Sequence, residues 1–109
     1  MDETNTPKVN KWNNEIDGEL CESSMEQKLD RLGYTFNKHS FPPGTDFPDH
    51  SHDTAKLAST VCGQFRISVC GQTFILEPGD MVEVPEKAVH SAGVVGSEEV
   101  VMYDAERKK

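Results

Sequence analysis

The stretch Phe47-Pro48-Asp49-His50-Ser51-His52 sets two histidines two residues apart, shortly after a proline. On a β-strand, residues i and i+2 point to the same face, so both imidazoles can converge on one point. Further along the chain, Pro85-Glu86-Lys87-Ala88-Val89-His90 supplies a third histidine just after a predicted strand ends. Three neutral imidazoles that leave coordination positions open suit a catalytic divalent metal. We therefore predict a metal site on His50, His52 and His90, against the simpler interpretation of surface or hydrogen-bonded histidines.

The segments on both sides of these histidines alternate between apolar and polar residues, as half-buried strands do. Turn residues separate them, among them Cys70-Gly71, where glycine tolerates the positive φ of a tight primed turn. The stretch around Gly93 and Gly96 is expected to be a further connection. Short strands at close spacing with Gly and Pro turns predict an all-β antiparallel sandwich or barrel. The predicted strands are residues 34–41, 56–61, 65–69, 73–76, 81–84 and 99–103.

The first histidine stretch resembles the first motif of the cupin superfamily, which has the form G-x5-H-x-H-x(3,4)-E-x6-G. Gly44, His50, His52 and Gly63 fall at those spacings. The glutamate position holds Lys56, with Leu57 as the other permitted position, so neither is acidic. The resemblance thus points to a three-histidine variant that lacks the usual motif-one glutamate.

The second stretch resembles the second cupin motif, G-x5-P-x-G-x2-H-x3-N. Gly79, Pro85 and His90 match it, while Lys87 stands in place of the glycine and Val94 in place of the asparagine. Together the two motifs span residues 44–94.

The resemblance implies a small single-domain cupin with an all-β fold, a cupin-type antiparallel β-barrel or jelly roll with a short N-terminal helix. It also implies a divalent metal ion on the three histidines: Fe, Mn, Ni, Cu or Zn. Such a site looks like the iron site of thiol and diketone dioxygenases. The alternative is that the metal site has been lost.

A short helix is predicted over residues 23–32. Ser23 and Glu26 have the spacing of a capping box, the apolar residues that follow recur at helical spacing, and Gly33 supplies the stop. The polar residues 1–20 are interpreted as a flexible N-terminal arm, with Trp12 as an anchor onto the body or a neighbouring subunit. Residues 21–109 are assigned to the cupin barrel.

Two cations are candidates for holding an anionic ligand. Lys56 lies four residues after His52, so on a regular strand it faces the same way as the histidines. A dication repels an ammonium, so Lys56 keeps its distance, is neutral, or meets an anion that bridges it to the metal. The ordinary alternative is a solvated lysine on a strand edge. Arg66 is the second candidate, although a hairpin arginine usually faces water.

Composition limits the partners. The 109 residues carry a formal net charge of −8 and a pI of about 4.8, which disfavours nucleic acid. No apolar run approaches the roughly 18–20 residues that cross a bilayer, and the N-terminus lacks the apolar core of a signal peptide, so we expect a cytoplasmic protein without a membrane partner. Three cysteines at irregular spacing argue against a disulfide framework.

Two classes of function follow. The first is a metal-dependent enzyme of the dioxygenase, isomerase or lyase type that acts on a small anionic molecule. The second is a non-catalytic module that binds a ligand or metal for sensing or storage, or a metal-free dimer scaffold, because fold alone does not decide function. A homodimer is expected in each case.

Overall fold

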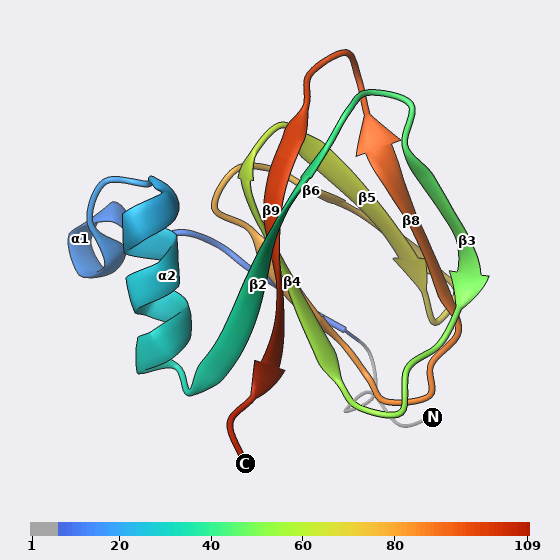
Figure 1. The fold of residues 1–109 in the computed structure, drawn as a ribbon, viewed down its shortest axis with the longest axis horizontal. Coiled ribbons are helices and arrows are strands. Elements are labelled where there is room, and N and C mark those ends of the chain that lie inside the picture. The colour runs from blue at the N-terminus through green and yellow to red at the C-terminus, as the bar shows by residue number, and fades with distance from the viewer. Residues whose placement is uncertain (1–6) are drawn as a thin grey trace.

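The computed structural model describes residues 7–109 and arranges their strands in two antiparallel sheets (Figure 1). The five-stranded sheet has the order β1-β7-β4-β9-β2, and the four-stranded sheet has the order β3-β8-β5-β6. The predicted all-β antiparallel architecture is confirmed. The strands are β1 Val9–Asn10, β2 Tyr34–Phe41, β3 Asp46–His50, β4 Lys56–Cys62, β5 Gln64–Val69, β6 Gln72–Leu76, β7 Met81–Val84, β8 His90–Val95 and β9 Val100–Arg107.

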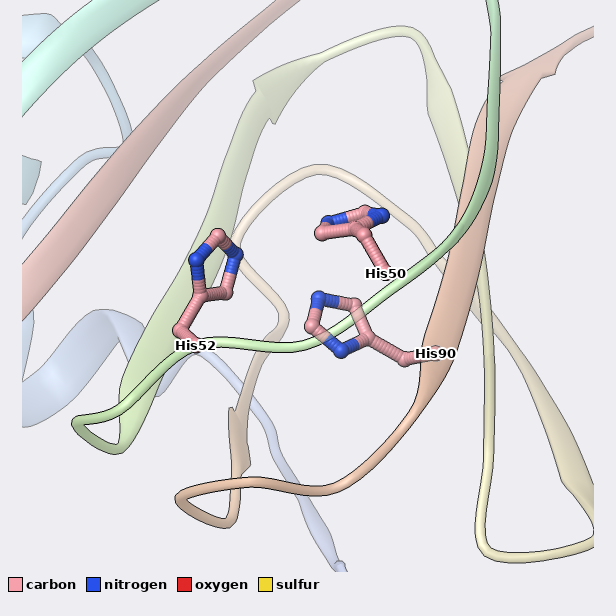
Figure 2. A group of neighbouring side chains, drawn as sticks. All are labelled: His50, His52 and His90. Atoms are coloured by element: carbon pink, nitrogen blue, oxygen red, sulfur yellow. The ribbon is translucent and has the colours of Figure 1, made fainter.

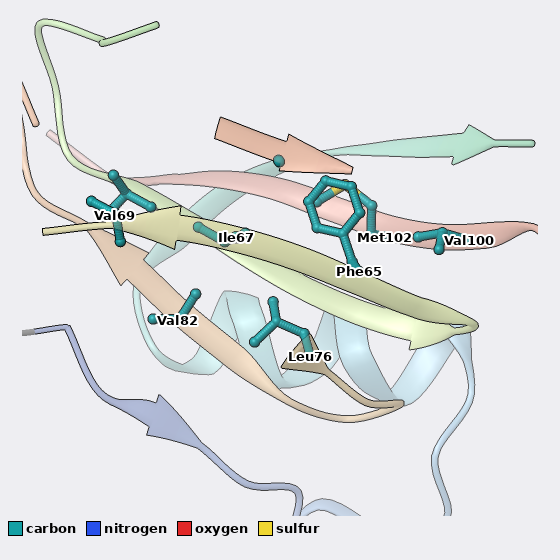
Figure 3. Packing of buried hydrophobic residues seen from close by; sticks show 9 residues of the cluster. Phe65, Ile67, Val69, Leu76, Val82, Val100 and Met102 are labelled. Carbon is teal, nitrogen blue, oxygen red and sulfur yellow. The ribbon is translucent and has the colours of Figure 1, made fainter. Parts of the chain in front are cut away.

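The main hydrophobic core lies between the two sheets (Figure 3). Alternate residues of β5, namely Phe65, Ile67 and Val69, face inwards and are buried, as the period of two requires. They pack against buried residues from the opposite sheet such as Val82 and Met102. The sequence alternation therefore decides which side of each strand enters this core.

A second core lies on the outer face of the five-stranded sheet, where helix α2 (Glu22–Arg31) covers it. Figure 1 shows α2 outside the sheet, beside β2, on the side away from β3 and β8. Met25 and Leu29 of α2 are fully buried against Tyr103 of β9. Burial of such side chains stabilises the fold by roughly 1.5–3 kcal/mol each.

The capping box of α2 differs from the predicted one. Cys21 is the N-cap: its Sγ accepts from the backbone N–H of Ser24 at 3.4 Å, and the Ser24 Oγ accepts from the Cys21 N–H at 2.8 Å. Glu26, the predicted partner of Ser23, instead accepts a hydrogen bond from the Tyr103 hydroxyl. The helix thus starts one residue before the predicted start, although the prediction of a helix that ends before Gly33 is confirmed.

The expected connection around Gly93 is the second difference. Gly93 lies inside β8, paired with Asp46 of β3 and Arg66 of β5. A Cβ at Gly93 would lie 2.9 Å from Arg66 Nη2 and 3.0 Å from Asp46 Oδ1, so glycine here makes room for an ion pair across the sheet. The primed turn at Cys70-Gly71 is confirmed, since φ is +53° and +74° at the two positions.

Residues 7–20 of the expected arm contain β1 and a helical turn, α1 (Asn14–Asp17). β1 pairs with β7, and Trp12 packs over Gly79, where a Cβ would lie 2.5 Å from that of Trp12. The indole therefore anchors this segment on the body of the same chain. Residues 1–6 of the arm lie outside the described residues, and the division of the chain at residue 20 stays a prediction.

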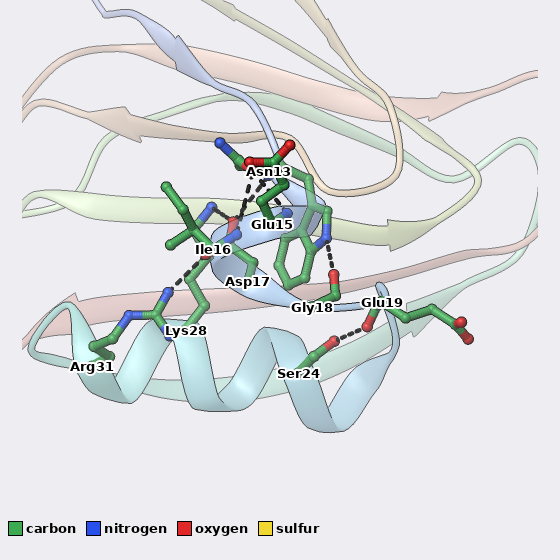
Figure 4. A network of polar contacts seen from close by, with 10 residues as sticks. Asn13, Glu15, Ile16, Asp17, Gly18, Glu19, Ser24, Lys28 and Arg31 are labelled. Atoms are coloured by element: carbon green, nitrogen blue, oxygen red, sulfur yellow. Dashed lines mark hydrogen bonds and ion pairs between the residues drawn. The ribbon is translucent and has the colours of Figure 1, made fainter.

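Asp17 ties α1 to α2 (Figure 4). Its side chain is 3% exposed and forms ion pairs with Lys28 at 2.8 Å and Arg31 at 2.7 Å. Burial alone would raise the pKa of this carboxyl, but hydrogen bonds from Lys28, the Asn13 backbone and Arg31, with the Lys28 charge, lower the pKa below its ordinary value. Asp17 is thus held as a carboxylate. Across residues 7–109, no helix has the length and apolar character needed to cross a membrane.

Candidate metal centre

Three histidines, from two neighbouring strands and the loop that follows one of them, meet at one end of the space between the sheets. His50 ends β3 and pairs in register with His90 at the start of β8, while His52 follows two residues after β3. Figure 2 shows the three rings gathered around a common space. One ligand atom from each ring lies within 4.8 Å of the other two, and the ring centroids are 4.1–5.2 Å apart. The predicted convergence of His50, His52 and His90 is present in the structure.

Backbone carbonyls orient two of the rings. His50 Nδ1 lies 2.8 Å from the Pro48 oxygen, and His90 Nδ1 lies 3.0 Å from the Ala88 oxygen. A carbonyl only accepts, so in each neutral ring Nδ1 carries the proton and donates it. The Nε2 lone pair of each ring is then left free for an electrophile. Metal-binding histidines in proteins commonly have this arrangement.

A backbone hydrogen bond joins the two histidine segments. The Lys87 N–H donates to the His52 oxygen at 2.6 Å, so the turn that leads into β8 holds the loop that carries His52. Lys87 has a φ of +63°, in the left-handed region that glycine adopts easily. Lys87 is the residue that stands where the second motif has glycine. Lys87 thus occupies a backbone conformation that glycine would adopt with less strain.

His52 is suited to remain a neutral ligand. Burial, followed by the neighbouring His50, His90 and Lys56, lowers the pKa of His52 below its ordinary value, and Asp104 opposes this only in part. A neutral imidazole has a lone pair to offer, whereas imidazolium has none. This electrostatic environment therefore favours the form that binds a metal.

The histidines open onto a cavity of about 260 Å³ between the sheets. Its polar end is formed by the three histidines, His39, Lys56 and Asp104. Apolar side chains from both sheets, including Phe41, Phe47 and Phe65, make up the rest of the wall. The site thus combines a nitrogen-donor cluster with a largely apolar chamber, as small-molecule sites do.

The two candidate cations lie on different sides of the cavity wall, one inside and one outside. Lys56 lines the cavity, and its Nζ lies 3.6 Å from Asp104 Oδ2 and 3.4 Å from Glu106 Oε2. Arg66 lies on the opposite face of β5 from the buried Phe65, and its Nη2 forms an ion pair with Asp46 at 3.0 Å. Lys56 is therefore brought to the histidines and Arg66 is not.

His39 and Asp104 also line the cavity, and neither was predicted from the sequence. His39 stands two residues before Phe41 on β2, so the period of two was the signal that could have placed both on one face. Asp104 follows the predicted strand end at residue 103, whereas β9 continues to Arg107. A strand prediction that was too short thus hid one acidic wall residue.

The model of the cupin domain family matches residues 37–106. Among solved structures, a cupin-2 domain containing protein from Shewanella frigidimarina has a TM-score of 0.58 and 23% identity, over 70% of this chain and 72% of that chain. Bacillus subtilis oxalate decarboxylase, described with Mn(II) centres, has a TM-score of 0.62 and 23% identity, over 70% of this chain and 22% of its own. No curated protein matches this chain.

A chain from the crystal structures of the DMSP lyases RdDddP and RnDddQII has a TM-score of 0.62 and 22% identity, over 69% of this chain and 38% of that chain. At these identities, the structural likenesses show a shared fold. The expected jelly-roll architecture is thereby confirmed.

Proposed function

Because this chain belongs to the cupin family, we propose that it is a metal-dependent enzyme that acts on a small anionic molecule. His50, His52 and His90 would hold one divalent metal ion. The observation that carries the proposal is the set of three imidazoles whose ligand atoms lie within 4.8 Å of one another. Two of those rings have their tautomer fixed by backbone carbonyls.

The donor set fits a divalent transition metal. Imidazole nitrogen suits Fe, Mn, Ni, Cu or Zn better than Mg or Ca, which prefer oxygen. Three nitrogens at about 2.0–2.1 Å from one ion are roughly 2.8–3.4 Å apart in tetrahedral or octahedral geometry, so rings whose ligand atoms lie within 4.8 Å of one another would draw closer together as they bind the ion. Three protein ligands leave coordination positions open for a substrate.

When bound, the ion supplies Lewis-acid or oxygen-activating chemistry at the end of the cavity. The chain supplies the rest of the site. The apolar part of the wall offers water few hydrogen-bond partners, which would strengthen electrostatic interactions with a bound ligand. Lys56, which lines the cavity, would hold the negative charge of the substrate. We expect a reaction of the dioxygenase, isomerase or lyase type.

Metal content tests the first part of the proposal. Protein purified without chelator should hold about one transition-metal ion per chain by elemental analysis, and His50→Ala combined with His90→Ala should remove it. His39→Ala is the matched control, because His39 lines the same cavity but is not part of the cluster. Metal-free protein whose melting temperature does not respond to added metal would refute the proposal.

Turnover tests the second part. Oxygen consumption and product formation with a panel of thiols, diketones and hydroxy acids would distinguish an enzyme from a binding module. Binding without turnover across the panel would favour the sensor or storage alternative. We further propose a cytoplasmic homodimer, which light scattering would contradict by giving the mass of a monomer at micromolar concentration.

A further inference from the structure

The wall of the cavity beside the histidines is aromatic. The ring of Phe41 packs edge-to-face with Phe47 at 5.0 Å and stacks with Phe65 at 6.3 Å. On its other side Phe41 stacks with His39, with a centroid distance of 5.6 Å and an interplanar angle of 9°. Phe41 and Phe47 are only half-buried, so the cavity exposes phenyl surface that no side chain covers fully. That surface favours a ligand with an apolar body.

The fixed charges at the polar end set the charge of the ligand. The ammonium of Lys56 faces two carboxylates, Asp104 and Glu106. A hydrogen bond from Thr54 and the nearby charge of Lys56 lower the pKa of Glu106, which keeps it ionised. With three neutral imidazoles and one divalent ion, these groups together carry a single net positive charge. One negative charge on a ligand neutralises the site, whereas a dianion would meet two carboxylates that repel it.

Lys56 has donor capacity left for a ligand. Its Nζ is 3.4 Å or more from both carboxylate oxygens, whereas charge-assisted N–H···O bonds measure about 2.7–2.9 Å. Lys28, in the ion pair with Asp17, reaches its partner at 2.8 Å and shows what a closed pair looks like in this molecule. Lys56 therefore has long contacts that a third oxygen can replace or join.

We propose that the ligand of this cavity is a small carboxylic acid with one negative charge and a flat apolar body. Its carboxylate lies between Lys56 and the three-histidine cluster, and its body lies against Phe41 and Phe47. A cavity of about 260 Å³ is smaller than the roughly 300–1,000 Å³ of sites for drug-sized molecules, so the body is about one ring or a short branched chain. This inference rests on the proposed metal site.

Calorimetry on the metal-loaded protein with three probes tests it. Phenylacetate has one charge and a ring, acetate has the charge alone, and oxalate has two charges and no apolar body. We expect phenylacetate to bind about tenfold or more tightly than either of the others. Equal or tighter binding of oxalate or acetate would overturn the inference.

Two pairs of variants locate the probe. Lys56→Met should weaken phenylacetate binding about tenfold, while Arg66→Met, which removes a partly exposed cation outside the cavity, should leave it unchanged. Phe47→Ala should also weaken it, while Phe74→Ala, at a partly buried phenylalanine outside the cavity lining, should not. Binding that follows Arg66 or Phe74 instead would overturn the inference, and thermal unfolding of each variant identifies any that fail to fold.

Different experimental outcomes would overturn the metal site and the ligand class. Metal that binds stoichiometrically while oxalate is preferred over phenylacetate overturns the ligand class and leaves the metal site standing. Protein that takes up no metal overturns the proposed function. The same calorimetry on that metal-free protein still decides about the aromatic wall, because a preference for phenylacetate over acetate supports it and equal binding refutes it.

Discussion

On its outer face, the five-stranded sheet packs against α2 through side chains that are completely buried, such as Leu29 and Tyr103. On its inner face, the same sheet ends in a cavity beside the half-buried ring of Phe41. One face has its apolar surface covered by the chain itself, and the other leaves apolar surface uncovered next to three histidines. The outer face is thus sealed by α2, whereas the inner face combines the main core with a cavity that remains open at the histidines.

Truncation of one apolar side chain on each face of the sheet is expected to give the largest difference in the free energy of unfolding. Leu29→Ala should lower the free energy of unfolding by about 3 kcal/mol, because it leaves a hole under α2. Phe47→Ala should cost only about 1 kcal/mol, because its ring borders a cavity that already exists. Urea denaturation at pH 7 measures both. An equal loss in the two variants would break the comparison between the faces.

Loss of the ion pairs that join α1 to α2 is expected to give the second largest change in the free energy of unfolding. Asp17→Asn should lower the free energy of unfolding by about 2 kcal/mol at pH 7, since hydrogen bonds to a charged group are lost. The folded pKa of Asp17 is depressed, so its contribution is fully present above the unfolded pKa of about 3.9. The contribution is lost as the pH falls through the lower, folded value.

Denaturation at several pH values checks this sign. The gap between the wild type and Asp17→Asn should stay constant from pH 7 to about pH 5 and shrink below about pH 4. A gap that widens in acid would contradict the assignment of the low pKa to Asp17.

One substitution at a buried position of β4 should stabilise the protein. Within residues 7–109, the Thr60 hydroxyl is buried and has no hydrogen-bond partner. Thr60→Val keeps the shape and removes the unsatisfied group, so the free energy of unfolding should rise by about 1 kcal/mol. Thr73→Val is the control, because that hydroxyl bonds to Ser68 at 2.9 Å and its loss should give no gain. A destabilised Thr60→Val would indicate an unseen partner such as ordered water.

The smallest effect concerns the turn beside the cavity. Lys87→Gly should raise the free energy of unfolding by about 0.5 kcal/mol, since relief of the left-handed strain exceeds the added entropy of the unfolded chain. Lys87→Ala should give no such gain, because alanine meets the same strain. Parallel denaturation curves of the three proteins measure the difference, and a gain with alanine would show that the lysine side chain is responsible.

The metal-site candidates were predictable because spacing carries the information. His50 and His52 stand two residues apart, and with His90 they fall in two motifs in register, neither of which depends on distant packing. Lys56 followed from strand alternation. The same alternation places Arg66 on the face opposite the inward-facing Phe65 and Ile67, so its position outside the cavity was also open to prediction.

The parts of the fold that were missed depended on unusual residues or on contacts distant in sequence. A cysteine N-cap lies outside the ordinary capping preferences, so Ser23 and Glu26 seemed the better pair. Glycine fits inside β8 at position 93 because the side chains of Asp46 and Arg66 meet above it, and this crowding appears only when three strands are side by side. β1 and α1 are held by contacts such as the one between Trp12 and Gly79, which are 67 positions apart.

Trp12 is the only tryptophan in the sequence, and its indole N–H donates to the Gly18 oxygen while Lys28 Nζ sits 4.9 Å from the ring. Its fluorescence therefore reports the docking of the N-terminal segment rather than the state of the interior. Emission that shifts at lower denaturant concentration than the circular dichroism signal of the sheets would reveal that this segment detaches as a separate cooperative unit. Coincident transitions would mean that the segment and the two sheets melt together.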